Sequence, residues 1–206
     1  DELEHEFTCS LDSALVHFDH GGAHVNLIDT PGGSDFMGKA ISALQAVETA
    51  IVVVDPSTGV NPAIRRIMKV CDERKLPRLM VINKLDGGSD LAACLESLQE
   101  AFGGRIRPIN LPSGGGDSVV DCFVASEGSS DLGDLGDFHT AIVEQVVEVD
   151  EDLMEQYLEA GEVAPDALSG AFARALREGP LSPVSFTYAR TGVGVDERIE
   201  ALVKRC

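Results

Sequence analysis

Apolar residues in the first half of the chain follow two periods in turn, and together they predict an open α/β sheet. Three apolar runs are expected to form buried strands: 25–28, which Asn26 interrupts, 50–54 and 79–82. The run at 50–54 is continuous and typical of a strand that is covered on both faces. Three segments with apolar residues three and four positions apart indicate the intervening helices: 37–48, 62–75 and 91–102. Strands that alternate with helices form a mostly parallel, doubly wound sheet. Residues 7–19 are expected to pair with the first run as a β-hairpin, because His20-Gly21-Gly22 is a turn signal.

The pattern changes after residue 105 and resumes at residue 181. We therefore expect an insertion at 106–180 within an α/β domain that is made of 1–105 and 181–206. The elements expected in the insertion are two paired strands, a mobile loop rich in Gly, Ser and Asp, and two helices: 106–111 with 119–124, 126–137, 137–159 and 165–178. The repeated aspartates of the loop match no known calcium-loop spacing. A strand at 184–188 and a helix at 195–204 complete the expected sheet pattern.

The charge balance narrows the expected partners. The chain has 16 Lys and Arg against 35 Asp and Glu, a formal net charge of −19. Contacts to a phosphate backbone depend on Lys and Arg, so no direct DNA contact is expected, whereas basic protein partners remain compatible with this charge. The five cysteines form no CxxC pair, and no apolar run reaches transmembrane length. We expect a cytoplasmic protein with reduced thiols and no membrane contact, and the start at Asp1 suggests a piece of a longer chain.

Asp29-Thr30-Pro31-Gly32 follows the first apolar run, where an open α/β sheet binds its ligands. An aspartate at a strand end is suited to hold Mg²⁺ through water, because Mg²⁺ keeps several waters and needs few carboxylates. A glycine lets its backbone N–H approach a terminal phosphate closely. Taken alone, the string is equally compatible with a plain turn leaving a strand.

Asn83-Lys84-Leu85-Asp86 follows the third apolar run. A carboxylate accepts two hydrogen bonds from the N1–H and exocyclic amine of guanine, a pair that adenine does not offer. The alkyl stem of a lysine packs against a base, and an asparagine amide braces neighbouring loops. A polar turn that caps the strand is the alternative for this string alone. Both strings in this order, one strand–helix unit apart, predict a GTP-binding protein.

The residues from Val25 to Asp86 resemble the G domain of bacterial elongation factor G and its paralogues. Residues 138–158 resemble the G′ subdomain of the same family, and the similarity extends from Glu2 to about Val203. The resemblance implies a P-loop NTPase-type α/β fold with an α+β insertion. It implies binding of GTP or GDP with Mg²⁺, GTP hydrolysis on the ribosome, and a cytoplasmic monomer. It also makes the acidic 138–159 helix a candidate contact for the ribosomal stalk protein.

The resemblance also assigns roles to single residues. Thr8 falls in the first switch segment as a ligand of Mg²⁺ and of the γ-phosphate. In the second switch, Asp29 holds Mg²⁺ through water, while Thr30, Pro31 and Gly32 lie at the nucleotide. The last guanine loop is implied at Thr187, Tyr188 and Ala189, where the Ala189 backbone N–H meets the base carbonyl.

Three departures from the family pattern affect these expectations. Gly33 stands where the family has the histidine that orients the attacking water, so hydrolysis is expected to be slow or differently triggered. Tyr188 stands where the family has a small serine. Its larger side chain is expected to crowd the base, and the alternative is simple drift within a paralogue. No phosphate loop G-x-x-x-x-G-K-[ST] is present; Gly38-Lys39 lies in an expected helix, and the family places the loop before the present Asp1. A non-catalytic ribosome- or partner-interaction module that keeps the fold is therefore the alternative, and a release factor or ribosomal protection protein is the alternative within the enzyme class.

Overall fold

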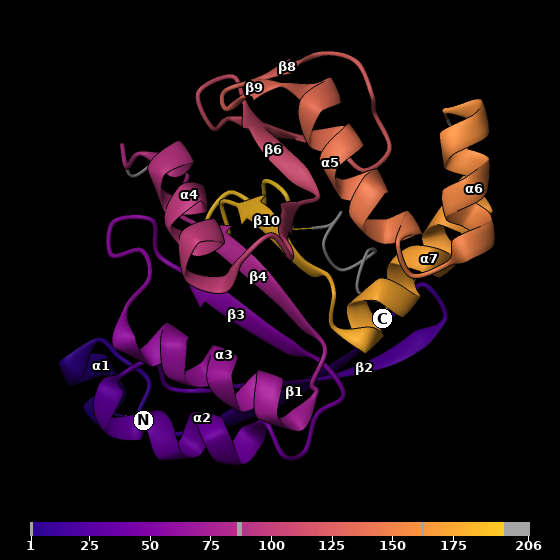
Figure 1. Cartoon of the computed structure of the whole chain (residues 1–206). Coiled ribbons are helices and arrows are strands. Elements are labelled where there is room, and N and C mark those ends of the chain that lie inside the picture. The colour runs from indigo at the N-terminus through magenta and orange to yellow at the C-terminus, as the bar shows by residue number, and fades with distance from the viewer. Residues whose placement is uncertain (1, 86–87, 162, 196–206) are drawn as a thin grey trace.

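A four-stranded parallel sheet forms the centre of the computed structural model, which describes residues 2–85, 88–161 and 163–195 (Figure 1). Its strands are, in spatial order, β3 (Ala50–Val54), β4 (Arg78–Asn83), β10 (Ser182–Thr187) and β5 (Ile106–Pro108). All three neighbouring pairs are parallel. The expected α/β class with a mostly parallel sheet is thus confirmed.

Helices α3 (Pro62–Arg74) and α4 (Leu91–Phe102) connect the strands as expected. Each starts at a side-chain cap: Asn61 accepts a hydrogen bond from the Ile64 amide, and Asp90 accepts one from the Ala93 amide. Their apolar faces meet the sheet in one core cluster that contains, among others, Met68, Leu98, Met80 and Ile82. Burial of these faces against the strands, rather than helix propensity alone, holds the two helices in place.

The opposite face of the sheet is covered by helices that the sequence assigns to the insertion. A second core cluster joins Leu79 and Val81 of β4 to α5 (Leu135–Val147) and α7 (Pro165–Glu178). Val146 and Ala175 are fully buried there. Strand β4 is consequently buried on both faces, which explains why its sequence is continuously apolar rather than alternating.

The first part of the chain forms α1 (Glu2–Phe7) and then the expected hairpin, β1 (Ala14–His20) with β2 (Ala23–Asp29). A 3-10 turn, η1 (Ser34–Phe36), leads into α2 (Met37–Ala43). The helix expected over 37–48 is therefore shorter, because short-range bonds such as Ala46 N–H to the Ala43 carbonyl replace the helical ladder. Gly38-Lys39 lies inside α2, as expected for a sequence that is no phosphate loop.

The hairpin forms its own two-stranded sheet, and β3 pairs only with β4 among the described residues. Both the hairpin and β3 carry exposed apolar side chains. Leu15 of β1 is 68% exposed and Val53 of β3 is 60% exposed. The face of β3 that carries Val53 thus lacks the cover that the same face of β4 receives.

The strand expected over 106–111 is wrong as a single element. Residues 106–108 form β5 at the edge of the central sheet, and only Asn110–Ser113, as β6, pairs with β7 (Ser118–Asp121). The backbone between them follows β10, because the Ile109 N–H donates to the Val184 carbonyl. Part of the expected loop at 126–137 is also ordered, as the small hairpin β8 (Ser129–Ser130) with β9 (Gly133–Asp134).

The single long helix expected over 137–159 is wrong: the chain breaks into α5 and α6 (Glu151–Ala160). Asp150 adopts an extended conformation at φ −144° and caps α6 by accepting hydrogen bonds from Asp152 and Leu153. Arg174 of α7 holds this corner through the Val149 carbonyl and the Asp150 carboxylate. Apolar spacing continues across the break, so periodicity alone does not reveal it.

Two further helices were expected, at 165–178 and at 195–204. Helix α7 matches the expected 165–178, whereas the helix expected at 195–204 lies outside the described residues apart from Val195. The division into 1–105, 106–180 and 181–206 stays a prediction. Within the described part of the chain, no helix has the length and apolarity to cross a membrane.

The Asp72 carboxylate at the end of α3 anchors the helix to the sheet. Arg105 binds it with two hydrogen bonds of 2.8 and 3.0 Å, and the buried Arg78 of β4 lies 2.6 Å away. The Arg105 guanidinium, assisted by Arg78, lowers the pKa of Asp72 below its ordinary value. The stabilisation is therefore fully present above that ordinary value and is lost as the pH falls through the lowered pKa.

We predict that Asp72→Asn lowers the free energy of unfolding by about 2 kcal/mol, less than for a fully buried pair because Asp72 is 45% exposed. The loss arises because Arg78, 4% exposed, keeps its charge without an anionic partner. Urea unfolding at neutral pH measures it, and the difference between variant and parent should shrink as the pH falls below the ordinary pKa of an aspartate. Glu73→Gln is the matched control, since its 3.7 Å pair with Lys69 is exposed and contributes at most about 0.5 kcal/mol. Equal losses in the two variants would contradict the anchoring role.

Candidate functional site

One side-chain amide joins the carboxyl ends of β4 and β10. Asn83 ends β4 and stands in register with Thr187, which ends β10. Its Oδ1 accepts a 3.0 Å hydrogen bond from the Ala189 backbone N–H and lies 3.4 Å from Thr187 Oγ1. The structure thus brings Asn83 next to the segment 187–189, which lies about a hundred residues further along the sequence.

The Ala189 N–H is engaged in a way that the sequence does not indicate. It is expected to meet a base carbonyl, but here it donates to Asn83. A base at this position therefore competes with Asn83 for that donor.

Lys84 forms an ion pair with an aspartate at the end of a third strand. Its Nζ lies 2.5 Å from Asp55 Oδ2, directly beyond β3. The Lys84 ammonium, together with the hydroxyl and amide of Ser57, lowers the pKa of Asp55 to about 2. The Lys84 backbone is left-handed, with φ 70°, an unusual conformation for a residue other than glycine. The lysine side chain is in this way turned across the strand ends rather than along α4.

The segment after β10 folds back on itself as a tight turn. The Tyr188 N–H donates to the Val193 carbonyl, and Thr191 and Gly192 both donate to the Tyr188 carbonyl. Gly194 then passes so close to β10 that a Cβ there would lie 2.5 Å from the Phe186 carbonyl oxygen. The half-buried Tyr188 ring packs against the first core cluster, so its bulk contributes to the core.

Asp29-Thr30-Pro31-Gly32 lies at the carboxyl end of β2, with Asp29 and Gly32 exposed and Pro31 buried. Gly32 has open space where a side chain would stand. Gly33 has an ordinary extended backbone at φ −67°, and a Cβ there would lie 3.2 Å from the Phe36 ring. Neither glycine therefore owes its presence to a left-handed conformation.

Thr8 follows α1 with a left-handed backbone at φ 51° and an exposed side chain. Among the described residues, it makes no hydrogen bond to Asp29 or to the other candidates. No group of three or more His, Cys, Asp and Glu arranged for a metal occurs in the described ranges. Asp86 lies outside the described residues, so its place relative to Asn83 and Lys84 is a prediction from the sequence.

Asp55 is a site residue that the sequence analysis does not include. Like Asp29, it directly follows an apolar run, and polar residues at the carboxyl ends of parallel strands are candidates for ligand binding. The sequence therefore contains the signal for Asp55. Its partner was not deducible, because the ion pair depends on the left-handed turn at Lys84.

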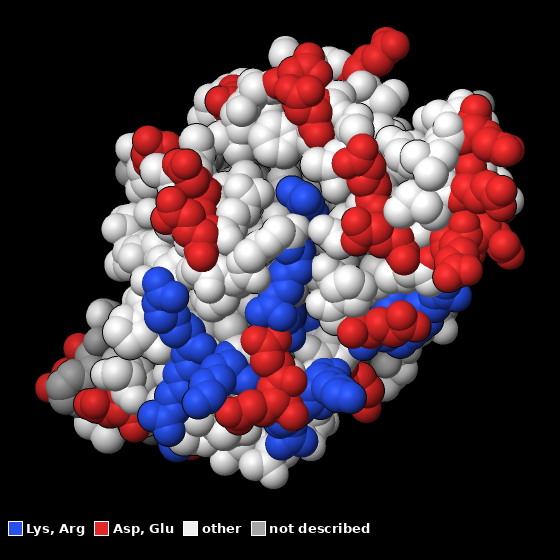
Figure 2. Space-filling model, viewed as in Figure 1, with Lys and Arg blue, Asp and Glu red and all other residues white. Residues whose placement is uncertain are grey.

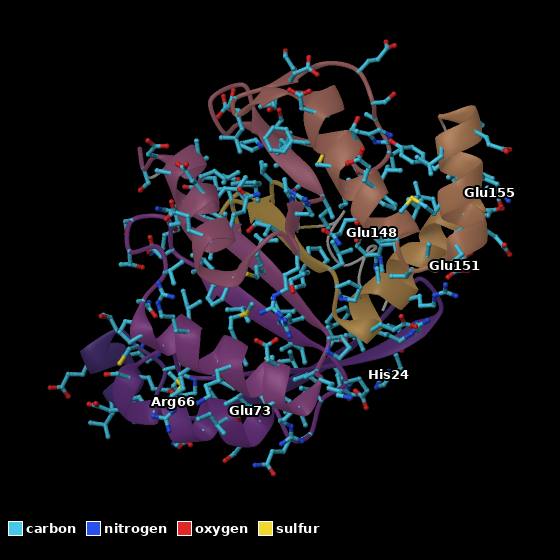
Figure 3. All side chains as sticks on the ribbon, in the orientation of Figure 1. His24, Arg66, Glu73, Glu148, Glu151 and Glu155 are labelled. Atoms are coloured by element: carbon cyan, nitrogen blue, oxygen red, sulfur yellow. The ribbon has the colours of Figure 1, made fainter. Side chains whose placement is uncertain are left out.

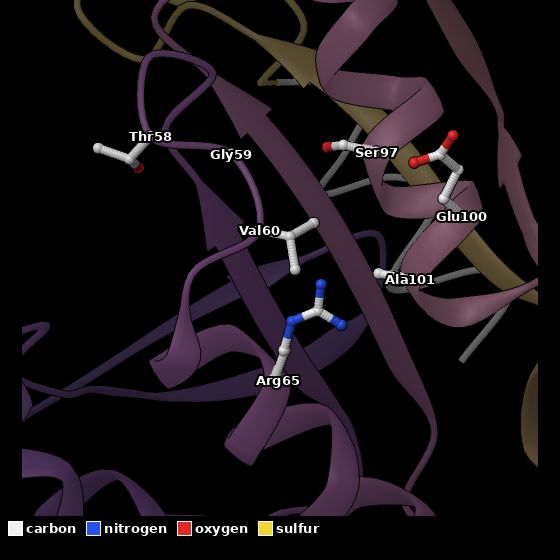
Figure 4. Close-up of a pocket in the computed structure, with 7 residues that line it drawn as sticks. All are labelled: Thr58, Gly59, Val60, Arg65, Ser97, Glu100 and Ala101. Atoms are coloured by element: carbon white, nitrogen blue, oxygen red, sulfur yellow. The ribbon is translucent and has the colours of Figure 1, made fainter.

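Two open cavities lie beside the segments that carry the strand-end residues. One of about 500 Å³ lies between the loop after β3 and α4 (Figure 4), and its lining comprises Thr58, Gly59, Val60, Arg65, Ser97, Glu100 and Ala101. The other, of about 370 Å³, lies between the hairpin and α2 and includes Ile28 and Lys39. Neither is lined by a residue of the two strings.

Open parallel α/β domains bind their ligands, nucleotides among them, at the carboxyl ends of the strands, and here those ends carry converging polar groups. Within that class, the chain belongs to the family described as the elongation factor Tu GTP binding domain, whose model matches residues 1–206. It is therefore a GTP-binding domain of the translation-factor type, as the two strings predict.

Relatives agree with this assignment. The chain is 29% identical to an elongation factor G-like protein of Mycobacterium tuberculosis, over 99% of this chain and 30% of that protein. It is 29% identical to peptide chain release factor 3 of Symbiobacterium thermophilum, over 98% of this chain and 40% of that protein. A crystal structure of a Thermus thermophilus protein superposes with a TM-score of 0.85 at 32% identity, covering 98% of this chain and 33% of that one. The chain thus spans well under half the length of each.

We predict that the Asp55 carboxyl titrates with a midpoint of about 2 and that Lys84→Ala raises this midpoint toward the ordinary value of about 3.9. The pair is complete above that ordinary value and is lost as the pH falls through about 2. Carboxyl carbon shifts in NMR measure the midpoint. Lys75→Ala is the matched control, because Lys75 is likewise a left-handed lysine but lies at the end of α3. An Asp55 midpoint that is the same in both variants would rule out the ion pair in solution.

Proposed function

We propose that this chain is the GTPase domain of an elongation factor G-like translation factor, which binds GTP with Mg²⁺ and hydrolyses GTP on the ribosome in the cytoplasm. The observation that carries the proposal is the contact of Asn83 with Thr187 and Ala189, because it joins the two segments that we assign to guanine recognition. Membership of the GTP-binding family supports the nucleotide. The names of the two relatives support the translational role.

Guanine recognition is assigned to the end of β4. The Asp86 carboxylate accepts from the two adjacent guanine donors, and the Lys84 stem packs against the base. Asn83 acts indirectly, by holding the loop at Thr187, Tyr188 and Ala189 in position. The ion pair with Asp55 limits the directions in which the Lys84 stem points.

The metal and the terminal phosphate are assigned to the end of β2. The exposed Asp29 carboxylate and the Thr8 hydroxyl are hard oxygen donors of the kind Mg²⁺ prefers, and one or two such ligands suffice beside water and phosphate oxygens. When bound, the ion would neutralise charge between the outer phosphates. Gly32 has open space where a side chain would stand, so a γ-phosphate can approach its backbone closely, next to Thr30 and Pro31.

The acidic surface of the insertion is the proposed contact for the ribosomal stalk protein. Figure 2 shows acidic side chains along α6, while Lys and Arg gather over α3. Glu148, Glu151 and Glu155 lie at the end of α5 and along α6 (Figure 3), and all three are exposed. Such a surface attracts a basic partner at long range.

A non-catalytic interaction module is the second candidate, and Gly33 is the observation that favours it. With no imidazole at this position, the chain lacks the family's group for orienting water. Single-turnover hydrolysis by the full-length protein with ribosomes separates the two candidates.

We predict that Asp86→Asn in the full-length protein exchanges a preference for GDP for one for xanthosine diphosphate. An amide presents a donor where the carboxylate presents only acceptors, and xanthine carries a carbonyl where guanine carries its amine. Competition binding with fluorescent nucleotide measures the exchange. Asp90→Asn is the control, because Asp90 caps α4 and has no assigned base contact. Retention of guanine preference by Asp86→Asn would remove Asp86 from base recognition.

We predict that Gly33→His raises the ribosome-stimulated single-turnover rate by at least about tenfold, since an imidazole at this position orients the attacking water. Gly33→Ala is the matched control, because its Cβ meets the same Phe36 ring at 3.2 Å without adding an imidazole. Equal rates in the two variants would show that the missing histidine does not limit turnover.

A further inference from the structure

The turn between β6 and β7 rests on the guanine string. Three consecutive glycines form this turn, all with left-handed backbones, at φ 68°, 73° and 91°. The first two are exposed, but Gly116 is buried, and a Cβ there would lie 3.2 Å from the Leu85 carbonyl oxygen and 3.3 Å from the Leu85 Cβ. Leu85 is itself 5% exposed and belongs to the first core cluster. The insertion thus packs backbone against backbone on the residue between Lys84 and Asp86.

A second hairpin fixes the turn from the other side. The Gly116 N–H donates to Asp131 Oδ2 at 3.1 Å, and the Asp131 N–H donates to the Pro112 carbonyl at 2.9 Å. Asp131 opens the repeated Asp-Leu-Gly sequence, so the first aspartate of that repeat has a structural contact at the turn.

The same β6 strand also binds β10 just before the second guanine loop. Asn110, 4% exposed, donates through Nδ2 to the Phe186 carbonyl at 3.1 Å. Its Oδ1 accepts from the Phe186 N–H at 2.8 Å and from Ser185 Oγ at 3.0 Å. A buried amide with its oxygen and nitrogen both engaged fixes the neighbouring backbone tightly, because leaving either group unpaired is costly. Thr187, the next residue, lies at Asn83.

We infer that the β6–β7 hairpin sets the positions of both guanine loops, with Gly116 and Asn110 as positioning residues for base recognition. The inference rests on the proposed guanine site and assigns its geometry to the insertion. Gly116 determines how far Leu85, the residue before Asp86 in the sequence, lies from the turn. Asn110 determines how far β10 extends before the loop at 187–189. Base discrimination then depends on residues that touch no nucleotide and lie outside both guanine loops in the sequence.

The test compares Gly116→Ala with Gly115→Ala in the full-length protein. Both substitutions place a methyl group on a left-handed backbone, but Gly115 has nothing within 4 Å of its Cβ position. The affinities for GDP and for inosine diphosphate are measured for each, because inosine lacks the exocyclic amine. Gly116→Ala is expected to lower the affinity for GDP, relative to that for inosine diphosphate, by about threefold or more. This is the effect of misaligning one hydrogen bond to a charged group. Gly115→Ala is expected to keep the parental ratio. General destabilisation would weaken both nucleotides alike and leave the ratio unchanged.

Hydrogen exchange in the nucleotide-free protein provides an independent readout. Peptides that cover 79–85 and 182–189 are expected to exchange faster in Gly116→Ala than in Gly115→Ala. Asp131→Ala is a second variant that loosens the turn without adding bulk, and it should act in the same direction. Unchanged exchange and an unchanged affinity ratio in both Gly116→Ala and Asp131→Ala would overturn the inference. If the parent does not distinguish the two nucleotides, guanine recognition fails, and the exchange data alone decide whether the hairpin positions the loops.

Discussion

Burial of β4 on both faces is the constraint on which the rest of the structure depends. Met80 and Ile82 face the core under α3 and α4, while Leu79 and Val81 face α5 and α7. A strand held from both sides has little freedom to shift, and a shift of one residue would move every side chain to the opposite face. Asn83, the last residue of β4, and Lys84 after it are therefore fixed in position at the carboxyl edge of the sheet. Thr187 of β10 and Asp55 after β3 lie at the same edge, since parallel strands end together.

Much of this arrangement follows from the sequence. The continuous apolar runs predict the strands, and the polar strings behind them predict the candidate site, because both signals are local. The break at Asp150 was missed because apolar spacing continues through it, while an aspartate that caps one helix looks like one more acidic residue on a longer one. The contact of Gly116 with Leu85 was not predictable from the sequence for another reason. It joins residues about thirty positions apart, and neither a glycine nor a leucine indicates such a contact by its residue type.

Two asparagine side chains, one buried and one half-buried, connect the segments of the candidate site by hydrogen bonds. Asn83 links β4 to the loop after β10, and Asn110, the first residue of β6, links β10 to β6. Each presents both a donor and an acceptor, which is what a backbone segment requires of a partner when water is absent. In a chain with a net charge of −19, neutral amides perform this task without adding to the repulsion among carboxylates. Strand β6 and the turn after it are in this way connected to the strand ends by hydrogen bonds and close packing.

The open flank of β3 has a consequence for the behaviour of this chain in solution. Ile51 and Val53 are 37% and 60% exposed beside a strand that has one partner among the described residues. Such an edge can accept a further strand, from another copy or from elsewhere in a longer polypeptide. Burial of the exposed apolar side chains would stabilise that pairing. Mutual repulsion between strongly acidic copies opposes it, but only over the distance that salt allows, about 8 Å at physiological ionic strength. The colloidal stability of the isolated chain is therefore a competition between edge pairing and charge, and added salt shifts it toward association.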